Sequence, residues 1–196
     1  MKVYAVIDTN VVVSSMLTDN QSSPTKYVLS SVRDGIIVPM INDDIIEEYK
    51  EVLSRDKFHF IQEDVASMLK MFRTRGEWNV PECVMRDFVD LNDVIFYETY
   101  LLRSDAYLVT GNLRHFPSES HIVSPADMAY IIQISEGISD GFLNERVGTY
   151  MPESIQRAWE AVERMRASAL ANGIADMSME EIDEEIRQYR NNKNRF

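Results

Sequence analysis

Short apolar segments separated by helical patterns constrain the fold of this chain more than any other feature. The apolar segments lie at residues 3–7, 36–41, 107–110 and 122–123. Such runs are typical of strands that are buried on both faces of a parallel sheet. Strand and helix therefore alternate, which predicts an α/β fold: a three-layer αβα sandwich around a central parallel sheet of four or five strands.

The predicted helices are marked by residues that favour helix ends. Gly35 follows a helical pattern at residues 24–34, and Asn42 can cap the next helix. Pro125 is suited to the first turn of a helix that runs through Ile134. Further helices are expected at residues 63–74 and, capped by Asn92, at residues 92–104.

The sequence changes character at Gly137. We expect a first domain at residues 1–136 and a helical C-terminal extension at residues 137–196. One long helix is predicted between Pro152 and Gly173. A last helix is predicted from Ser178, which forms a capping-box pattern with the glutamate three residues later.

Composition and charge exclude several classes of protein. A chain of 196 residues with 45% hydrophobic residues can bury a sizeable core. Its single cysteine excludes an internal disulfide framework, and its net charge of −12 argues against a protein that coats nucleic acid generally, although a nuclease remains compatible. The N-terminal segment does not resemble a signal peptide, and no apolar run is long enough for a membrane span, so we expect a cytoplasmic protein.

Polar residues follow two of the predicted strands. Asp8 ends the first apolar run, and Thr110, Gly111 and Asn112 follow the third. Functional groups in parallel sheets gather at the carboxyl ends of the strands. An Asp that forms a turn, and an ordinary Gly-Asn turn, are the alternative interpretations.

Further carboxylates lie on predicted helices. Glu48 lies close to the buried face of its helix, although most acids on such a helix are solvated surface residues. Asp90 and Asp93 are three residues apart near a helix start and can share one side. Helix capping is the alternative role for both, because acids are stabilised at the first turn.

In this order and on these elements, the residues resemble the PIN domain family, including VapC-like toxins of toxin–antitoxin systems. The resemblance spans about residues 1 to 130 and rests on the segments VIDTNVVVSSM, INDDIIEEYKEVLSR, DLNDVIFYETYLLRSDAYLVTGNLRHFP and HIVSP. It implies a metal-dependent endoribonuclease, a hydrolase that cleaves single-stranded RNA, with Mg²⁺ or Mn²⁺ as cofactor.

The resemblance also assigns roles to individual residues. Asp8, Glu48 and Asp93 would bind the metal, and Asn112 would complete the catalytic set where many PIN domains carry a fourth acid. The residues that would support these ligands by hydrogen bonding are Thr9, Asn10, Ser14 and Thr110, with Asp90 as a secondary candidate. A neutral amide adds no charge, so Asn112 predicts weaker metal binding or an inactive centre.

Candidate RNA contacts are local because the chain is acidic. Arg114 and His115 follow Asn112, and Arg55 and Lys57 follow the helix that carries Glu48. Charged residues that are simply solvated at helix ends are the alternative interpretation for the last pair.

The C-terminal segment resembles the helical tails of some antitoxins, although an ordinary amphipathic helix is the alternative. The resemblance implies that Arg187 or Arg190 neutralises the acids and inhibits the enzyme. An antitoxin protein and a second copy of the chain are the other expected partners.

Two other functions share features with this sequence. A non-catalytic PIN module that binds RNA or protein would account for Asn112 and for the negative charge. A haloacid-dehalogenase-like phosphatase is disfavoured because it requires an Asp at the position of Asn10.

Overall fold

The protein is built around one parallel sheet. The computed structural model describes residues 2–80, 93–136 and 151–193. All strand pairs are parallel, and the strand order is β3-β2-β1-β4-β5. The strands are β1 (Val3–Ile7), β2 (Ile37–Ile41), β3 (Glu77–Trp78), β4 (Tyr107–Val109) and β5 (Ile122–Val123). The predicted α/β fold is confirmed.

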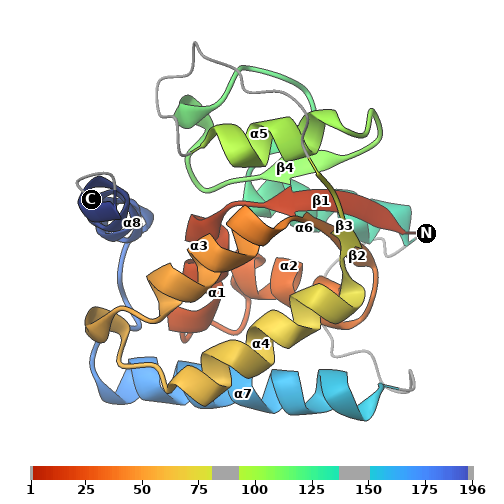
Figure 1. Cartoon of the computed structure of the whole chain (residues 1–196). Coiled ribbons are helices and arrows are strands. Elements are labelled where there is room, and N and C mark those ends of the chain that lie inside the picture. Colours follow the sequence, from red (N-terminus) through yellow and green to blue (C-terminus); the bar gives the residue numbers. More distant parts are fainter. Residues whose placement is uncertain (1, 81–92, 137–150, 194–196) are drawn as a thin grey trace.

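Helices flank this sheet on both faces. The described α-helices are α1 (Thr9–Leu17), α2 (Pro24–Arg33), α3 (Asp43–Leu53), α4 (Gln62–Arg75), α5 (Val94–Leu101), α6 (Pro125–Ser135), α7 (Glu153–Ala171) and α8 (Met179–Lys193). Short 3₁₀ turns lie at η1 (Asp56–Phe58) and η2 (Leu113–His115). Figure 1 shows α5 on one side of β1, and α2 and α4 on the other.

Several predicted helix ends are confirmed. The Asn42 side chain accepts a hydrogen bond from the backbone of Ile45, at 2.8 Å. Gly35 and Gly173 follow α2 and α7 with φ angles of 74° and 67°, a left-handed conformation that favours glycine. Ser178 and Glu181 exchange the two hydrogen bonds of a capping box at the start of α8. The predicted cap Asn92 lies outside the described residues.

Helix α1 was not predicted. Its sequence, TNVVVSSML, is buried along almost its whole length, so it lacks the polar face that makes a surface helix recognisable. Strand β3 was also not predicted, because it has only two residues and lies at the edge of the sheet. The predicted strands and the other helices correspond to observed elements.

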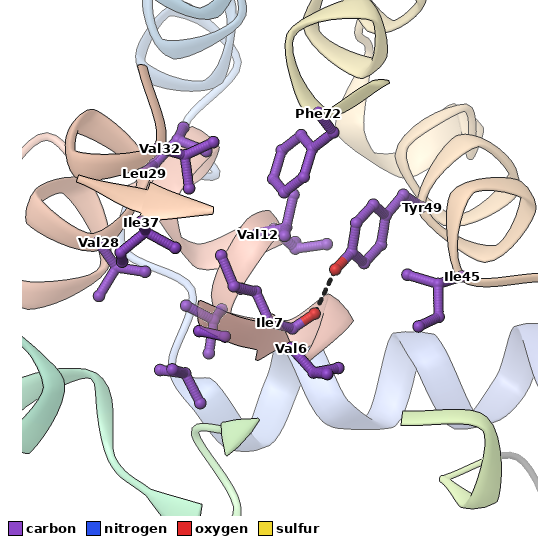
Figure 2. Close-up of a cluster of buried hydrophobic side chains, with 14 of the residues drawn as sticks. Val6, Ile7, Val12, Val28, Leu29, Val32, Ile37, Ile45, Tyr49 and Phe72 are labelled. Carbon is purple, nitrogen blue, oxygen red and sulfur yellow. Dashed lines mark hydrogen bonds between the residues drawn. The ribbon is translucent and has the colours of Figure 1, made fainter. Parts of the chain in front are cut away.

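One hydrophobic cluster of the described residues joins the sheet to the helices that flank it. Figure 2 shows Val6 and Ile7 of β1 among side chains of α1, α2, α3 and α4. Tyr49 of α3 is buried there, and its hydroxyl donates a hydrogen bond to the carbonyl oxygen of Ile7. The last residue of β1 is thereby fixed to α3 directly before Asp8.

The C-terminal helices pack on the rest of the molecule. Helix α7 lies along α4 and α1, and α8 lies beside α1 (Figure 1). Buried residues of both helices, such as Val162 and Ile186, belong to the same hydrophobic cluster as the sheet. The division into residues 1–136 and 137–196 stays a prediction. Within the described residues, every helix is too short or too polar to span a bilayer.

Candidate functional site

The candidate site begins where the two central strands end. Ile7 of β1 pairs with Val109 of β4, so the residues that follow them are neighbours. The Asp8 backbone N–H continues this pairing by donating to the carbonyl oxygen of Val109, at 2.9 Å. The parallel sheet therefore places Asp8 beside Thr110, as the strand ends predicted.

The Asp8 carboxylate is held by hydrogen bonds from two sides. The Thr110 hydroxyl donates to Oδ2 at 2.6 Å, and the Asn10 side-chain amide donates to the same oxygen at 3.0 Å. Asn10 is itself oriented by Gly111, whose backbone N–H donates to Asn10 Oδ1 at 3.0 Å. These contacts fix the orientation of Asp8, while the role of Thr110 and Asn10 in supporting a metal ligand stays a prediction.

Glu48 reaches the site from α3. Its side chain is buried, whereas Glu47 on the same helix is partly exposed and forms an ion pair with Lys50. Thr9, at the start of α1, donates a hydrogen bond to Glu48 Oε1 at 2.6 Å. The position of Glu48 near the buried face of its helix is confirmed.

Asp93 lies at the N-terminus of α5, with 1% of its surface exposed. His115 Nδ1 is 3.1 Å from Asp93 Oδ2. The Asn112 amide nitrogen is within hydrogen-bond distance of His115 Nε2, at 2.8 Å. Because that nitrogen also donates to the carboxylate of Asp183, Nε2 accepts, and Nδ1 faces the Asp93 carboxylate.

A cation from the C-terminal helix occupies the centre of these acids. Arg190 of α8 donates to Asp93 Oδ1 and to Glu48 Oε1, both at 2.8 Å. Arg190 is 5% exposed. Burial acts against its charge, but Glu48 and Asp93 outweigh burial and raise the pKa of its guanidinium further above the ordinary value.

Asp183, also on α8, is a site residue that the sequence did not predict. Its carboxylate accepts hydrogen bonds from Asn10 at 2.9 Å and from Asn112 at 3.2 Å. Asp183 precedes Arg190 by seven residues, so the two side chains share one face of the helix. That spacing was the only sequence signal for Asp183.

Together these residues line a small recess at the carboxyl ends of the central strands β1 and β4. Its described lining consists of Asp8, Asn10, Asp93, His115, Asp183, Ile186, Arg187 and Arg190. Arg187 lies at the rim, and its guanidinium forms an ion pair with Glu184. Helix α8 therefore closes one side of the recess.

Other predicted site residues lie elsewhere. The Ser14 hydroxyl is 3.3 Å from that of Thr25, and Arg114 is exposed. Arg55 and Lys57 both contact Glu185 of α8. Asp90 lies outside the described residues.

The electrostatic balance of the recess favours a cation. Burial, and then the charge of Asp93, raise the pKa of Asp8 from 3.8 to about 7, although Arg190 and Thr110 act in the opposite direction. The charge of Asp183 is a smaller cause of this raised pKa. A second positive charge would stabilise the ionised form of Asp8.

The donor set is chemically suited to a hard divalent cation, because carboxylate oxygens are the ligands that Mg²⁺ and Mn²⁺ prefer. With α8 in place, however, no three acidic, histidine or cysteine residues in the described ranges are arranged to hold a metal ion. Arg190 lies between Glu48 and Asp93 instead. The carboxylate oxygens of the site are therefore suited to a metal ion, but two of these carboxylates bind the Arg190 guanidinium in this structure.

The fold and the site together define an α/β protein of nuclease type with an acidic centre at the sheet edge. The family model described as PIN domain matches residues 4–114, which is more than half of the chain. The chain therefore belongs to the PIN domain family, whose members are generally nucleases, typically metal-dependent ribonucleases. Neither the search of curated proteins nor that of solved structures found a match.

The family match has a boundary that matters for the site. It includes Asp8, Glu48, Asp93 and Asn112 and ends within η2. Asp183 and Arg190 lie far beyond it, on α8. The four residues therefore lie within the matched region, whereas the helix that closes the recess lies beyond it.

Proposed function

We propose that the protein is a metal-dependent endoribonuclease that cleaves single-stranded RNA by phosphodiester hydrolysis. The observation that carries the proposal is the convergence of buried carboxylates on one cation. Glu48 and Asp93 bind the Arg190 guanidinium directly, and Asp8 faces the same recess and adds to the electrostatic stabilisation of that charge. Three acids from different elements, focused on one positive charge, are suited to bind a divalent cation once Arg190 withdraws.

The roles of the protein groups follow from their contacts. Asp8, Glu48 and Asp93 would hold Mg²⁺ or Mn²⁺, which when bound supplies an activated water and stabilises the charge that develops on the phosphate. Thr110 and Asn10 keep Asp8 oriented, and Thr9 does the same for Glu48. These hydrogen bonds reduce the rearrangement that metal binding requires.

His115 and Asn112 extend the site toward the exposed side of the recess. Asn112 orients the imidazole, and Nδ1 of the imidazole lies 3.1 Å from Asp93 Oδ2. His115 is partly exposed, so it can also reach a bound strand. We assign the pair a positioning role for Asp93 and for the substrate.

The alternative function is a catalytically weak or inactive PIN module that binds RNA or protein. Two features support it: Asn112 contributes no charge to the centre, and Arg190 neutralises part of the acid cluster. Both functions predict a folded acidic recess, but only the enzyme predicts cleavage that depends on Asp8.

Cleavage of single-stranded RNA with Mn²⁺ tests the proposal. The assay compares the wild type, Asp8→Asn and Asp44→Asn, an exposed acid on α3 that serves as the matched control. We expect Asp8→Asn to lower the rate by more than the ~10–100-fold that follows loss of a supporting partner of a metal ligand. Asp44→Asn should cleave like the wild type.

A second background separates an inhibited enzyme from an inactive one. The same variants are assayed with Arg190→Met, and Mn²⁺ binding is measured by calorimetry. If Arg190→Met binds Mn²⁺ but neither background cleaves RNA, the enzyme proposal is wrong and the binding module is favoured. Cleavage that is equally fast in Asp8→Asn would also contradict the proposed centre.

The toxin role, the antitoxin partner and the cytoplasmic location belong to the same proposal. They are supported by the sequence resemblance to VapC-like proteins. Growth arrest on expression of the wild type, and not of Asp8→Asn, is the outcome expected for a toxin. A homodimer stays a prediction.

A further inference from the structure

The carboxylate of Glu185, on α8, forms ion pairs with Arg55 and Lys57, the two basic residues that follow α3. Glu185 Oε2 is 2.9 Å from Arg55 Nη2, and Glu185 Oε1 is 2.6 Å from Lys57 Nζ. Arg55 also donates to the backbone carbonyl oxygen of Glu185. Glu185 is largely buried, and both of its carboxylate oxygens contact this basic pair. Arg55 and Lys57 therefore form a binding position for one anionic group, called the basic seat below.

The same helix places a cation among the acids. Arg190 follows Glu185 by five residues, which is about 7.5 Å along a helix axis. The basic seat and the acidic centre are also linked by α3, because Glu48 lies on that helix and Arg55 follows its end. Two binding positions of opposite charge therefore lie near each other, and α8 fills both.

A nucleic-acid strand at a metal-dependent centre needs both kinds of position. A cation must sit among the carboxylates, and a phosphate of the strand must be held nearby by basic groups. Arg190 provides positive charge at the first position, and Glu185 provides negative charge at the second. Helix α8 thus carries the charges of a bound cation and of a bound phosphate in one segment.

We propose that Arg55 and Lys57 form a phosphate-binding subsite for single-stranded RNA, and that Glu185 occupies this subsite while Arg190 occupies the cation position. Helix α8 is then an internal occupant of the substrate groove. The choice of RNA as the ligand rests on the proposed function, but binding at the subsite is separate from metal binding and from cleavage.

The contacts of Glu185 are of a kind that a polyanion can replace. The side chains of Arg55 and Lys57 are 23% and 48% exposed, so a dissolved anion can reach both cations and compete with Glu185 for them. A strand offers several phosphates and releases counterions when it binds. In a chain with a net charge of −12, such a local pair of cations is needed to hold a phosphate.

The test measures binding of fluorescein-labelled oligo(U) in EDTA, where no metal is present, by anisotropy over a range of salt concentrations. Glu185→Gln keeps the shape of the side chain and the backbone acceptor for Arg55 while it removes the competing charge. We expect binding at low salt to tighten by about fivefold or more. The slope of the logarithm of the binding constant against the logarithm of the salt concentration should become more negative by ~1.4. This corresponds to about 0.7 for each of the two freed cations on a single strand.

Control variants separate an effect at the subsite from an effect of net charge. Glu184→Gln changes the net charge equally but removes an exposed acid of α8, so its binding should match that of the wild type. Adding Arg55→Gln and Lys57→Gln to Glu185→Gln should abolish the gain. Circular dichroism checks the fold, and Glu185→Ala provides a second variant without the carboxylate.

Two outcomes would overturn the subsite. One is equal tightening in Glu184→Gln and Glu185→Gln, which would be an effect of net charge alone. The other is a gain that persists without Arg55 and Lys57. Neither outcome bears on cleavage, because the assay contains no metal, and a failed cleavage assay would leave this binding result intact.

Discussion

At the scale of the residue, the surroundings of Asp8 oppose the charge of its carboxylate. It lies at the end of the central strand, where it is almost fully buried. Burial first, and then Asp93, raise its pKa from 3.8 to about 7. The hydrogen bonds from Thr110 and Asn10 hold the carboxylate in place without removing this conflict.

This conflict predicts a pH dependence of stability in EDTA. Between pH 3.8 and about 7, folded Asp8 keeps a proton that the unfolded chain has lost, so the free energy of unfolding falls as the pH rises. At about 1.4 kcal/mol per pH unit, the loss amounts to up to ~4 kcal/mol. Asp8→Asn, which cannot ionise, should remove this part of the pH dependence.

Urea unfolding at pH 5 and pH 8 provides the measurement, with Asp44→Asn as the control. The wild type and Asp44→Asn should both be less stable at pH 8, and Asp8→Asn should lose less stability between the two pH values. Mn²⁺ should restore stability at pH 8 in the wild type, because a bound cation favours the ionised carboxyl. Equal pH dependence in the wild type and Asp8→Asn would show that Asp8 is not the buried acid described.

At the scale of the element, α8 is held at three places along its length. Its first residue, Met179, packs against Gly111 in the loop after β4. Glu185 and Arg190 make the charged contacts described above, while Ile182 and Ile186 are buried. Contacts at both ends explain how one helix can close the recess without belonging to the sheet.

The contact between Gly111 and Met179 predicts an energetic coupling. A Cβ added at Gly111 would lie 2.5 Å from the Met179 sulfur, which is closer than real atoms approach. The flexible Met179 side chain must shift to admit the added methyl group, so Gly111→Ala should cost about 1 kcal/mol, the lower end of the range for overpacking. Combined with Met179→Ala, the same change should cost less, by a coupling of about 0.5–1 kcal/mol.

Urea unfolding of the wild type, both single variants and the double variant measures this coupling. The φ angle of Gly111 is not positive, so backbone strain does not add to the expected effect. Additive losses in the double variant would mean that the start of α8 does not lie on the loop after β4.

At the scale of the whole molecule, α7 joins the C-terminal region to the sheet. Ile155, Val162 and Met165 of α7 are buried in the same cluster as the strands. Arg164 of α7 also forms an ion pair with Asp64 of α4. We therefore expect α7 to unfold together with the region that contains the family match.

The two tryptophans allow this to be measured. In a Trp78→Phe background, Trp159 of α7 is the remaining tryptophan and reports on that helix, while circular dichroism reports on the whole chain. The two urea transitions should coincide. Met165→Ala should move both transitions to lower urea together, because it should lower the free energy of unfolding by ~2–5 kcal/mol. Arg157→Ala, at an exposed position of α7, should have a small effect. A Trp159 transition at lower urea would indicate a separate unit.

Local sequence patterns predicted most elements but missed two. The strands, the cap at Asn42 and the glycine after α2 all have signals within a few residues. Helix α1 has no polar face, so its run of valines is as compatible with a strand as with a helix. Strand β3 is too short to show a period.

Local signals in the sequence mark the acids of the candidate site, whereas Arg190 was expected only from the antitoxin-like resemblance of the C-terminal segment. Asp8 and Glu48 are marked by a strand end and a helix face, and both signals are local. Asp183 contacts Asn10 across 173 positions of the chain, and Glu185 contacts Lys57 across 128. No local pattern encodes contacts at such separations, because they depend on how α8 packs after the other elements have formed.

The position of Arg190 along the chain also has a consequence during translation. Asp93 completes the trio of acids, and Arg190 follows it by 97 residues. At about 5–20 residues per second, a ribosome needs roughly 5–20 seconds to travel between them. In a nascent chain, the three acids are therefore synthesised several seconds before the guanidinium that pairs with two of them.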